Sequence, residues 1–238
     1  MTTPAAPARD PAVADRSDPV EAALDALPVK PRMRGWLHAG AAVVSVVAGI
    51  VLVTIAWSLR GGGAALATAI YSLTIVALFT ISGCYHRLDW SPHGRAVMKR
   101  LDHSMIFVFI AGTYTPIAVL ATEPSTRDWV LATVWTGAVL GVGLKMFWPG
   151  APRWVGVPLY IALGWVGVFV FPEILHGGGV AALVLIILGG VAYTLGGIAY
   201  GTKRPDPFPA TFGFHEVFHA CTIVAAACHY LAIWLVLF

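Results

Sequence analysis

The sequence predicts an all-α membrane protein that crosses the bilayer seven times. Hydrophobic residues make up 58% of the chain and charged residues only 11%, with a mean hydropathy of +0.78. Soluble domains carry about a quarter charged residues, so this composition indicates a chain that is integral to a membrane. The charges are scattered between apolar segments, which gives no basic patch for nucleic acid, and we expect no nucleic-acid partner.

Seven apolar stretches follow one another, each near the roughly 20 residues that a bilayer core requires. The expected spans are 36–59, 65–87, 101–121, 128–147, 154–173, 178–200 and 213–236. Short connections rich in glycine and proline separate them, among them Gly61-Gly62-Gly63, Pro149-Gly150-Ala151-Pro152 and Gly177-Gly178-Gly179. The sequence therefore predicts one seven-helix transmembrane domain over residues 33–238.

Residues 1–32 have a different composition, dominated by Ala, Pro and Asp and ending in Leu-Pro-Val-Lys-Pro-Arg. Such a composition predicts a disordered tail. A charged start followed directly by an apolar core is missing, so the tail does not resemble a secretory signal. We expect the first hydrophobic span itself to direct insertion.

The distribution of lysine and arginine predicts the orientation. With the N-terminus in the cytoplasm, the near tail and the inner loops place eleven basic residues inside, and two, Arg60 and Arg127, lie outside. The inside residues are Lys30, Arg32, Arg34, Arg87, Arg95, Lys99, Arg100, Lys145, Arg153, Lys203 and Arg204. The positive-inside rule therefore predicts an N-in, C-out topology, with a cytoplasmic tail.

This topology places several ionisable residues at one membrane depth on the cytoplasmic side. The second span ends there, the first, third and seventh begin there, and the residues are His38, His86, Asp102, His103, His215 and His219. Ionisable side chains are costly in hydrocarbon, so such a group is a candidate functional site. His229 lies about 21 Å deeper than His215 on a nearly shared helix face, too far to join it at one metal ion.

The pattern His215-x-x-x-His219 predicts a metal site. Four residues apart on a helix, the two imidazoles differ by about 40° and one turn, so both can reach one ion. His86 is available as a third ligand, and Asp102 as an acceptor for a water or a ligand. Three histidines with one open position is an arrangement typical of catalytic zinc, which polarises carbonyls and activates water.

Four segments together resemble the hemolysin III branch of the progestin-and-adipoQ-receptor family. They are Ser82-Gly83-Cys84-Tyr85-His86, Leu101-Asp102-His103-Ser104, His215-x-x-x-His219, and the stretch Phe109-Ile110-Ala111-Gly112-Thr113-Tyr114-Thr115-Pro116. The family pattern is Ser-x-x-x-His ending the second span, Asp opening the third, and His-x-x-x-His in the seventh. The resemblance covers nearly the whole chain from about residue 34, including the span count.

The resemblance implies a cytoplasmic-side Zn²⁺ held by His86, His215 and His219 in a multi-pass protein of a bacterial plasma membrane. It further implies that Asp102 contacts the zinc through water, and that Ser82, one turn before His86, supports the ligands. Many relatives open the first span with an acidic residue and Asn before a His. Here the segment is Arg34-Gly35-Trp36-Leu37-His38, so that only His38 is retained, as a further supporting residue.

The residues 215–219 also satisfy the HExxH pattern of zinc proteases, in which Glu216 would be the general base. The candidate third ligand and the aspartate lie upstream, in the order of the receptor-like family. Downstream of His219 the only histidine is His229, which lies too deep. The sequence therefore favours the receptor-like interpretation over an intramembrane protease.

Three functions from different classes remain open. The first is a zinc-dependent hydrolase of a lipid amide or ester, similar to a ceramidase, with Asp102 positioning water. The second is a protein of membrane-lipid homeostasis, in which zinc is structural and a fourth ligand such as His38 or Asp102 closes the site. The third is a pore-forming cytolysin, which the largely apolar spans disfavour. In the first two a membrane lipid is the partner, as substrate or ligand.

Overall fold

The computed structural model describes residues 30–238, which form α-helices joined by short connections. Within this range there is no β-strand, and the β-type pairing is one isolated bridge between Phe208 and Phe212. The predicted all-α class is therefore confirmed. The predicted disordered tail, residues 1–32, falls outside the described residues except for its last three positions.

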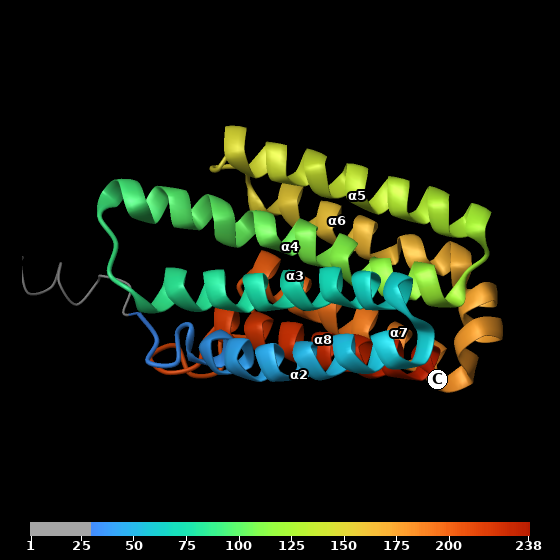
Figure 1. The fold of residues 1–238 in the computed structure, drawn as a ribbon. Helices are drawn as coiled ribbons and strands as arrows, with labels where there is room; N and C mark the ends of the chain where they lie inside the picture. The colour runs from blue at the N-terminus through green and yellow to red at the C-terminus, as the bar shows by residue number, and fades with distance from the viewer. Residues whose placement is uncertain (1–29) are drawn as a thin grey trace, which may run out of the picture. The chain divides into compact units, whose positions relative to one another are not determined.

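The helices run alongside one another (Figure 1). In chain order they are α2 (Trp36–Arg60), α3 (Gly62–Arg87), α4 (Pro92–Ala121), α5 (Pro124–Phe147), α6 (Arg153–Gly164), the 3₁₀ segment η2 (Trp165–Val170), α7 (Phe171–Thr202) and α8 (Phe214–Leu237).

Local sequence signals account for where several helices begin and end. Pro92 and Pro124 are the first residues of α4 and α5, where the missing backbone N–H costs no hydrogen bond. The Ser91 hydroxyl caps α4 by accepting a hydrogen bond from the Gly94 amide at 3.1 Å. Gly61, at φ 78°, joins α2 to α3 in the left-handed region that glycine adopts without strain.

Six helical stretches are long and apolar enough to cross a membrane, so the chain is a multi-pass membrane protein. They are α2, α3, α4, α5, the stretch Arg153–Thr202, and α8. The stretch Arg153–Thr202 has 50 residues and contains both predicted spans 154–173 and 178–200. Gly179 interrupts it with φ 75° and ψ 176°, close to the predicted boundary between those spans.

The helix faces are sorted between interior and surroundings. Tyr71 and Phe109 are buried between helices, whereas Val43, Leu73 and Leu140 are exposed. Exposed aliphatic side chains on apolar helices are expected where lipid, rather than water, is the solvent. This sorting agrees with a domain that lies in a bilayer.

The helices pack as successive neighbours, α2 on α3, α3 on α4 and α4 on α5, and α8 packs on both α7 and α2. Contacts at both ends show that α2 and α8 run in the same direction. At their N-terminal ends Arg34, just before α2, forms an ion pair with Glu216 of α8. At their C-terminal ends the Arg60 Nε donates to the Leu237 carbonyl at 2.9 Å.

The segment before α2 is fastened to the loop before α8. The Arg32 and Met33 amides donate to the Ala210 and Thr211 carbonyls at 3.0 Å each. These bonds hold the beginnings of α2 and α8 together. Since α3 returns antiparallel to α2, its last residues reach the same place, which we call the histidine end.

Candidate metal centre

Three histidines meet at the histidine end. His86 lies in the last turn of α3, and His215 and His219 lie in the first two turns of α8. One ring nitrogen from each lies within 4.8 Å of the other two, and the Nε2 atoms of His86 and His215 are 3.1 Å apart. These are the three residues that the sequence analysis proposed as ligands. The structure brings them together although 129 residues separate the first two.

The distances fit a metal ion. In a tetrahedral zinc site with Zn–N bonds of about 2.0–2.1 Å, ligand nitrogens lie about 3.4 Å from one another. The 3.1 Å separation between His86 and His215 is close to that value. Two facing ring nitrogens at this distance have no room for a proton on each, so at least one presents a lone pair. These described residues could therefore hold a metal ion.

The backbone at the start of α8 aims His215 and His219 at the same point. Gly213 precedes the helix, and its amide donates to Glu216 Oε2 at 2.9 Å. The Phe214 amide donates to Asp206 Oδ1, also at 2.9 Å. These carboxylates satisfy amides that have no partner within the helix and complement its positive end. The first turn of α8 is thereby fixed.

Glu216, the glutamate of the HExxH pattern, is 0% exposed and committed to two partners. One carboxylate oxygen accepts from Arg34 and the other from the Gly213 amide. Both oxygens are thus engaged with backbone and side chain at the beginnings of α2 and α8. Glu216 is therefore part of the frame that holds the histidines.

A close approach of α2 and α3 brings His86 into position. Gly35 has φ 82°, and a Cβ atom there would lie 2.7 Å from the His86 Cβ. A Cβ atom on Gly83 would lie 3.2 Å from the Ala39 backbone. Any side chain at either position would push α3 away from α2, and so would move His86 relative to α8.

Asp102 and Ser82 lie beside His86. Asp102 Oδ2 is 3.9 Å from His86 Nε2, and the buried Ser82 hydroxyl hydrogen-bonds the Asp102 side chain. The carboxylate is therefore oriented by Ser82 and lies within the reach of one water molecule from the histidine nitrogens. This arrangement agrees with the roles that the sequence analysis proposed for both residues, which stay proposals.

His38 lies against the ring face of His219. The two rings stack with centroids 3.7 Å apart and planes 9° apart. His38 is buried, and neither of its ring nitrogens has a hydrogen-bond partner. His38 therefore packs on the ring face of a candidate ligand. Its nitrogens are not among those that converge from His86, His215 and His219.

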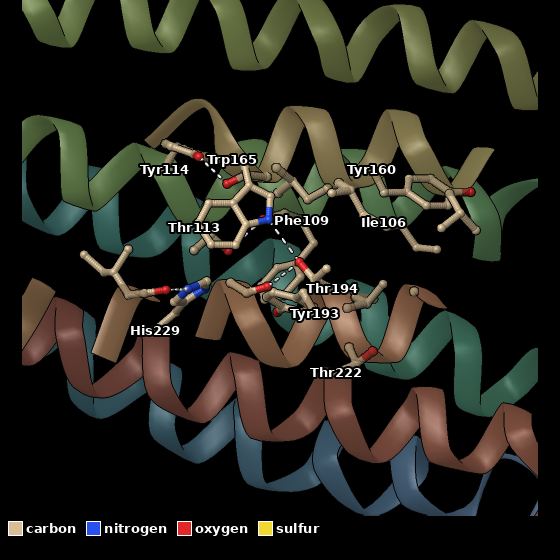
Figure 2. Close-up of a pocket in the computed structure, with 18 of the residues that line it drawn as sticks. Ile106, Phe109, Thr113, Tyr114, Tyr160, Trp165, Tyr193, Thr194, Thr222 and His229 are labelled. Carbon is tan, nitrogen blue, oxygen red and sulfur yellow. Dashed lines mark hydrogen bonds between the residues drawn. The ribbon is translucent and has the colours of Figure 1, made fainter. Parts of the chain in front are cut away.

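A cavity of about 130 Å³ opens beside the histidines and extends between α4, α6, α7 and α8 (Figure 2). His38, Ser82, Asp102, His215 and His219 line one end, and most of the remaining lining is apolar. His229 lies at the far end, 9% exposed, with Nε2 3.2 Å from the Ile186 carbonyl. This hydrogen bond links α8 to the neighbouring helix α7.

Several cavity residues were not identified from the sequence. Trp165 donates to Thr194 Oγ1 at 3.0 Å across the cavity (Figure 2). The Tyr193 hydroxyl is buried without a hydrogen-bond partner, and Tyr200 contacts both His103 and His215. An aromatic residue in an apolar helix is also what ordinary packing requires, so its sequence position alone does not mark it as a cavity residue.

Comparison with known proteins agrees with the motifs. A family model described as Haemolysin-III related matches residues 28–230. Hemolysin-3 of Bacillus cereus is 30% identical over 166 residues, which cover 68% of this chain and 74% of that protein. The human monocyte to macrophage differentiation factor is 27% identical over 172 residues, covering 69% of this chain and 68% of that protein.

A plant protein is similar over a comparable length. The rice heptahelical transmembrane protein ADIPOR2 is 27% identical over 181 residues, which cover 69% of this chain and 76% of that protein. The family match spans most of the chain and includes every residue of the histidine cluster. This chain belongs to the hemolysin III family, within the progestin-and-adipoQ-receptor superfamily.

Proposed function

We propose that His86, His215 and His219 bind one zinc ion and that the centre hydrolyses an amide or ester bond of a membrane lipid. The observation that carries the proposal is the convergence of three imidazole nitrogens within 4.8 Å, beside a largely apolar cavity. Three histidines leave one position open in a tetrahedral zinc site, which is the arrangement of catalytic zinc. The cavity offers an acyl chain an apolar environment next to that position.

The surrounding residues have separate tasks in this reaction. A bound zinc ion supplies Lewis-acid chemistry, through which a carbonyl is polarised and water is activated. Asp102 accepts a hydrogen bond from the attacking water and takes up its proton, while Ser82 keeps the carboxylate oriented. His38 holds the ring of His219 in place by stacking on it. The apolar cavity wall keeps bulk water from the scissile bond.

We also propose seven spans with the N-terminus in the cytoplasm. Successive spans alternate in direction, and α2 and α8 run the same way, so the count from α2 to α8 is odd. A straight helix of 50 residues would be about 75 Å long, more than twice the bilayer core. Counting Arg153–Thr202 as two spans that meet at Gly179 gives seven, in agreement with the heptahelical relative.

The alternatives have weaker support. A cytolytic pore, which the name of the Bacillus cereus relative suggests, needs a polar path through the domain, but the cavity lining is mostly apolar. A protease of the HExxH type needs a free glutamate, but Glu216 is held by Arg34 and Gly213. A zinc site with a purely structural role in lipid homeostasis needs a fourth ligand. Of the two candidates, His38 lies against a ligand ring, and Asp102, 3.9 Å from His86 Nε2, is near enough to reach the ion through a water.

Metal analysis of the purified protein tests the zinc proposal. We expect about one zinc per chain in the wild type and a loss of most of it in His86→Ala, His215→Ala and His219→Ala. His93→Ala, which changes an exposed histidine at the start of α4, is the matched control and should keep the metal. Zinc content that is unchanged in all three ligand variants would disprove the site.

Lipid assays then separate the functions. A zinc-loaded wild type should release fatty acid from a lipid amide or ester, and Asp102→Asn should lower this rate by about 10²–10⁴-fold while zinc stays bound. Absence of turnover with every lipid amide and ester tested, at full zinc occupancy, would favour the structural role. Release of a dye from liposomes containing the wild type would instead favour the pore.

A further inference from the structure

Three cations border the metal centre without an acidic partner. Lys99 of α4, Lys145 of α5 and Arg153 of α6 all interact electrostatically with His103. Within residues 30–238 the ion pairs involve Arg34, His86 and Arg127, so that none of these three cations is neutralised. We call Lys99, Lys145 and Arg153 the cationic rim.

Lys145 is the most unusual member because its side chain is only 7% exposed. Its ammonium group lies 5.7 Å from the centroid of the Tyr160 ring and has no hydrogen-bond acceptor among the described residues. The positive-inside rule explains exposed lysines at a membrane surface but not one that is withdrawn from water. A cation that is largely desolvated and unpaired is unfavourable unless something else brings the negative charge.

The Lys145 ammonium group packs closely against Gly156 and Tyr160. A Cβ atom on Gly156 would lie 2.8 Å from Lys145 Nζ and 3.4 Å from the Tyr160 hydroxyl. Glycine therefore lets the ammonium group approach α6 closely. Two hydrogen-bond donors, one from α5 and one from α6, lie near one another at this point.

Arg153 is held in a fixed orientation nearby. Its guanidinium lies 4.4 Å over the Tyr200 ring and 5.3 Å over Phe214, and its Nη1 donates to the Tyr200 carbonyl at 3.1 Å. Its guanidinium also hydrogen-bonds the Tyr200 side chain, and its other N–H groups have no partner among the described residues. Stacked guanidinium groups with free N–H donors are well suited to bind phosphate or carboxylate.

Residues of the cavity wall connect the rim to the metal centre. Tyr160, Tyr200 and His103 line the cavity and at the same time contact or face the cations. The Tyr200 ring lies 5.6 Å from His215, and its hydroxyl is 3.4 Å from His103 Nε2. A molecule with an anionic group on the rim can thus extend its apolar part into the cavity, passing the histidines.

We propose that the cationic rim binds the phosphate or carboxylate headgroup of an anionic membrane lipid whose acyl chain enters the cavity. This binding site does not depend on the proposed hydrolysis, because the cations and the cavity exist whether or not zinc cleaves the lipid. An anion here offsets the unpaired charge of Lys145 and lies beside the metal centre.

Native mass spectrometry of the full chain in detergent tests the proposal by counting bound phosphatidylglycerol and phosphatidylcholine, which differ in net charge at equal acyl chains. We expect the wild type to prefer phosphatidylglycerol by about tenfold or more, the size of one charge-assisted hydrogen bond. Lys145→Met and Arg153→Gln should abolish the preference, and Lys145→Arg should retain most of it.

Two further variants separate charge from folding. Gly156→Ala keeps every cation, but its Cβ atom would lie 2.8 Å from Lys145 Nζ and displace the ammonium group, so it should weaken the preference without removing charge. Arg95→Gln removes an exposed cation of α4 that lies over Tyr85 and is not part of the rim, and should leave the preference unchanged. Zinc content at the wild-type level in each variant shows that the metal centre has folded.

The outcomes decide whether the bound anion is a lipid headgroup or a soluble anion such as phosphate. A preference that is lost in the Lys145 and Gly156 variants and kept in Arg95→Gln supports a lipid headgroup. Equal binding of both lipids by the wild type, or a preference that survives Lys145→Met and Arg153→Gln, would overturn the proposal. Binding of inorganic phosphate with no preference between the lipids would likewise overturn it, and would assign the rim to a soluble anion.

Discussion

The histidine end of the cavity and its far end, around His229, are formed by neighbouring helices but differ in chemistry. At the histidine end, polar side chains from α2, α3, α4 and α8 converge, and the cationic rim adds charge. At the far end, the His229 ring contacts one carbonyl and leaves Nδ1 without a partner among apolar neighbours. The comparison shows that the groups able to bind an ion are concentrated at the histidine end, while the far end is a mainly apolar part of the cavity.

The strongest test of this difference concerns the Arg34–Glu216 pair, which fastens the histidine end. Arg34→Met leaves Glu216, at 0% exposure, as a buried charge without its partner. We expect the free energy of unfolding to fall by about 3–5 kcal/mol, measured by titration with a denaturing detergent. Arg127→Met removes the exposed pair with Asp128 and should cost no more than about 1 kcal/mol. An equal loss of unfolding free energy in both variants would contradict a special role of the Arg34–Glu216 pair at the histidine end.

His219 and His229 lie on α8 at opposite ends of the cavity, and they provide the second test. His219→Ala removes a proposed ligand, and zinc affinity should fall by more than about 100-fold. Removing a residue that only orients a ligand typically costs about 10–100-fold. His229→Ala, ten residues further along the helix, should change zinc affinity by less than about twofold because it lies about 15 Å away. Competition with a chelator of known affinity measures both values. A large loss in His229→Ala would show that the far end is coupled to the metal.

Asp102 tests how far the histidine end extends beyond the three ligands. Asp102→Asn preserves the shape of the side chain but removes its charge, 3.9 Å from His86. Zinc affinity should fall by about 10–100-fold, as for other residues that orient metal ligands. The same chelator competition measures it, with Asp128→Asn, an exposed carboxylate distant from the site, as the control. A variant with wild-type affinity would place Asp102 outside the metal centre.

The smallest effect is expected at the far end. A Cβ atom on Gly189 would lie 2.4 Å from His229 Nε2, whereas the nearest atom to a Cβ on Gly190 is 3.6 Å away. Gly189→Ala should therefore displace the ring and lower the free energy of unfolding by about 1–3 kcal/mol, while Gly190→Ala should be tolerated. Zinc affinity should stay unchanged in both. A stable Gly189→Ala variant would show that the far end is loosely packed.

The sequence allowed the candidate metal centre to be located but not the residues that hold it in place. Charged and imidazole side chains are rare in apolar helices, and span direction gives their depth, so His86 and His215 could be assigned to one place. Arg34 and Glu216 lie 182 residues apart, and their pairing depends on the parallel course of α2 and α8. The HExxH pattern also suggested a different role for Glu216, that of a general base, which its two partners in the structure disfavour.

Other features depend on packing that sequence patterns do not record. The interruption at Gly179 lies close to the predicted boundary between the spans 154–173 and 178–200, whereas the 3₁₀ segment η2 between α6 and α7 has no distinct sequence signal. Lys145 was counted as one of many cytoplasmic basic residues. That it is withdrawn from water depends on how α5 meets α6 at Tyr160 and Gly156, which only the three-dimensional structure shows.

The placement of the three candidate ligands on α3 and α8 has a consequence for biogenesis. His86 is synthesised and inserted early, whereas His215 and His219 belong to the last described helix. A nascent chain that has not yet inserted α8 holds one imidazole of the three. Occupancy of the proposed site should therefore require insertion of α8 and report completed assembly, and a chain truncated before α8 should be made without metal at this site.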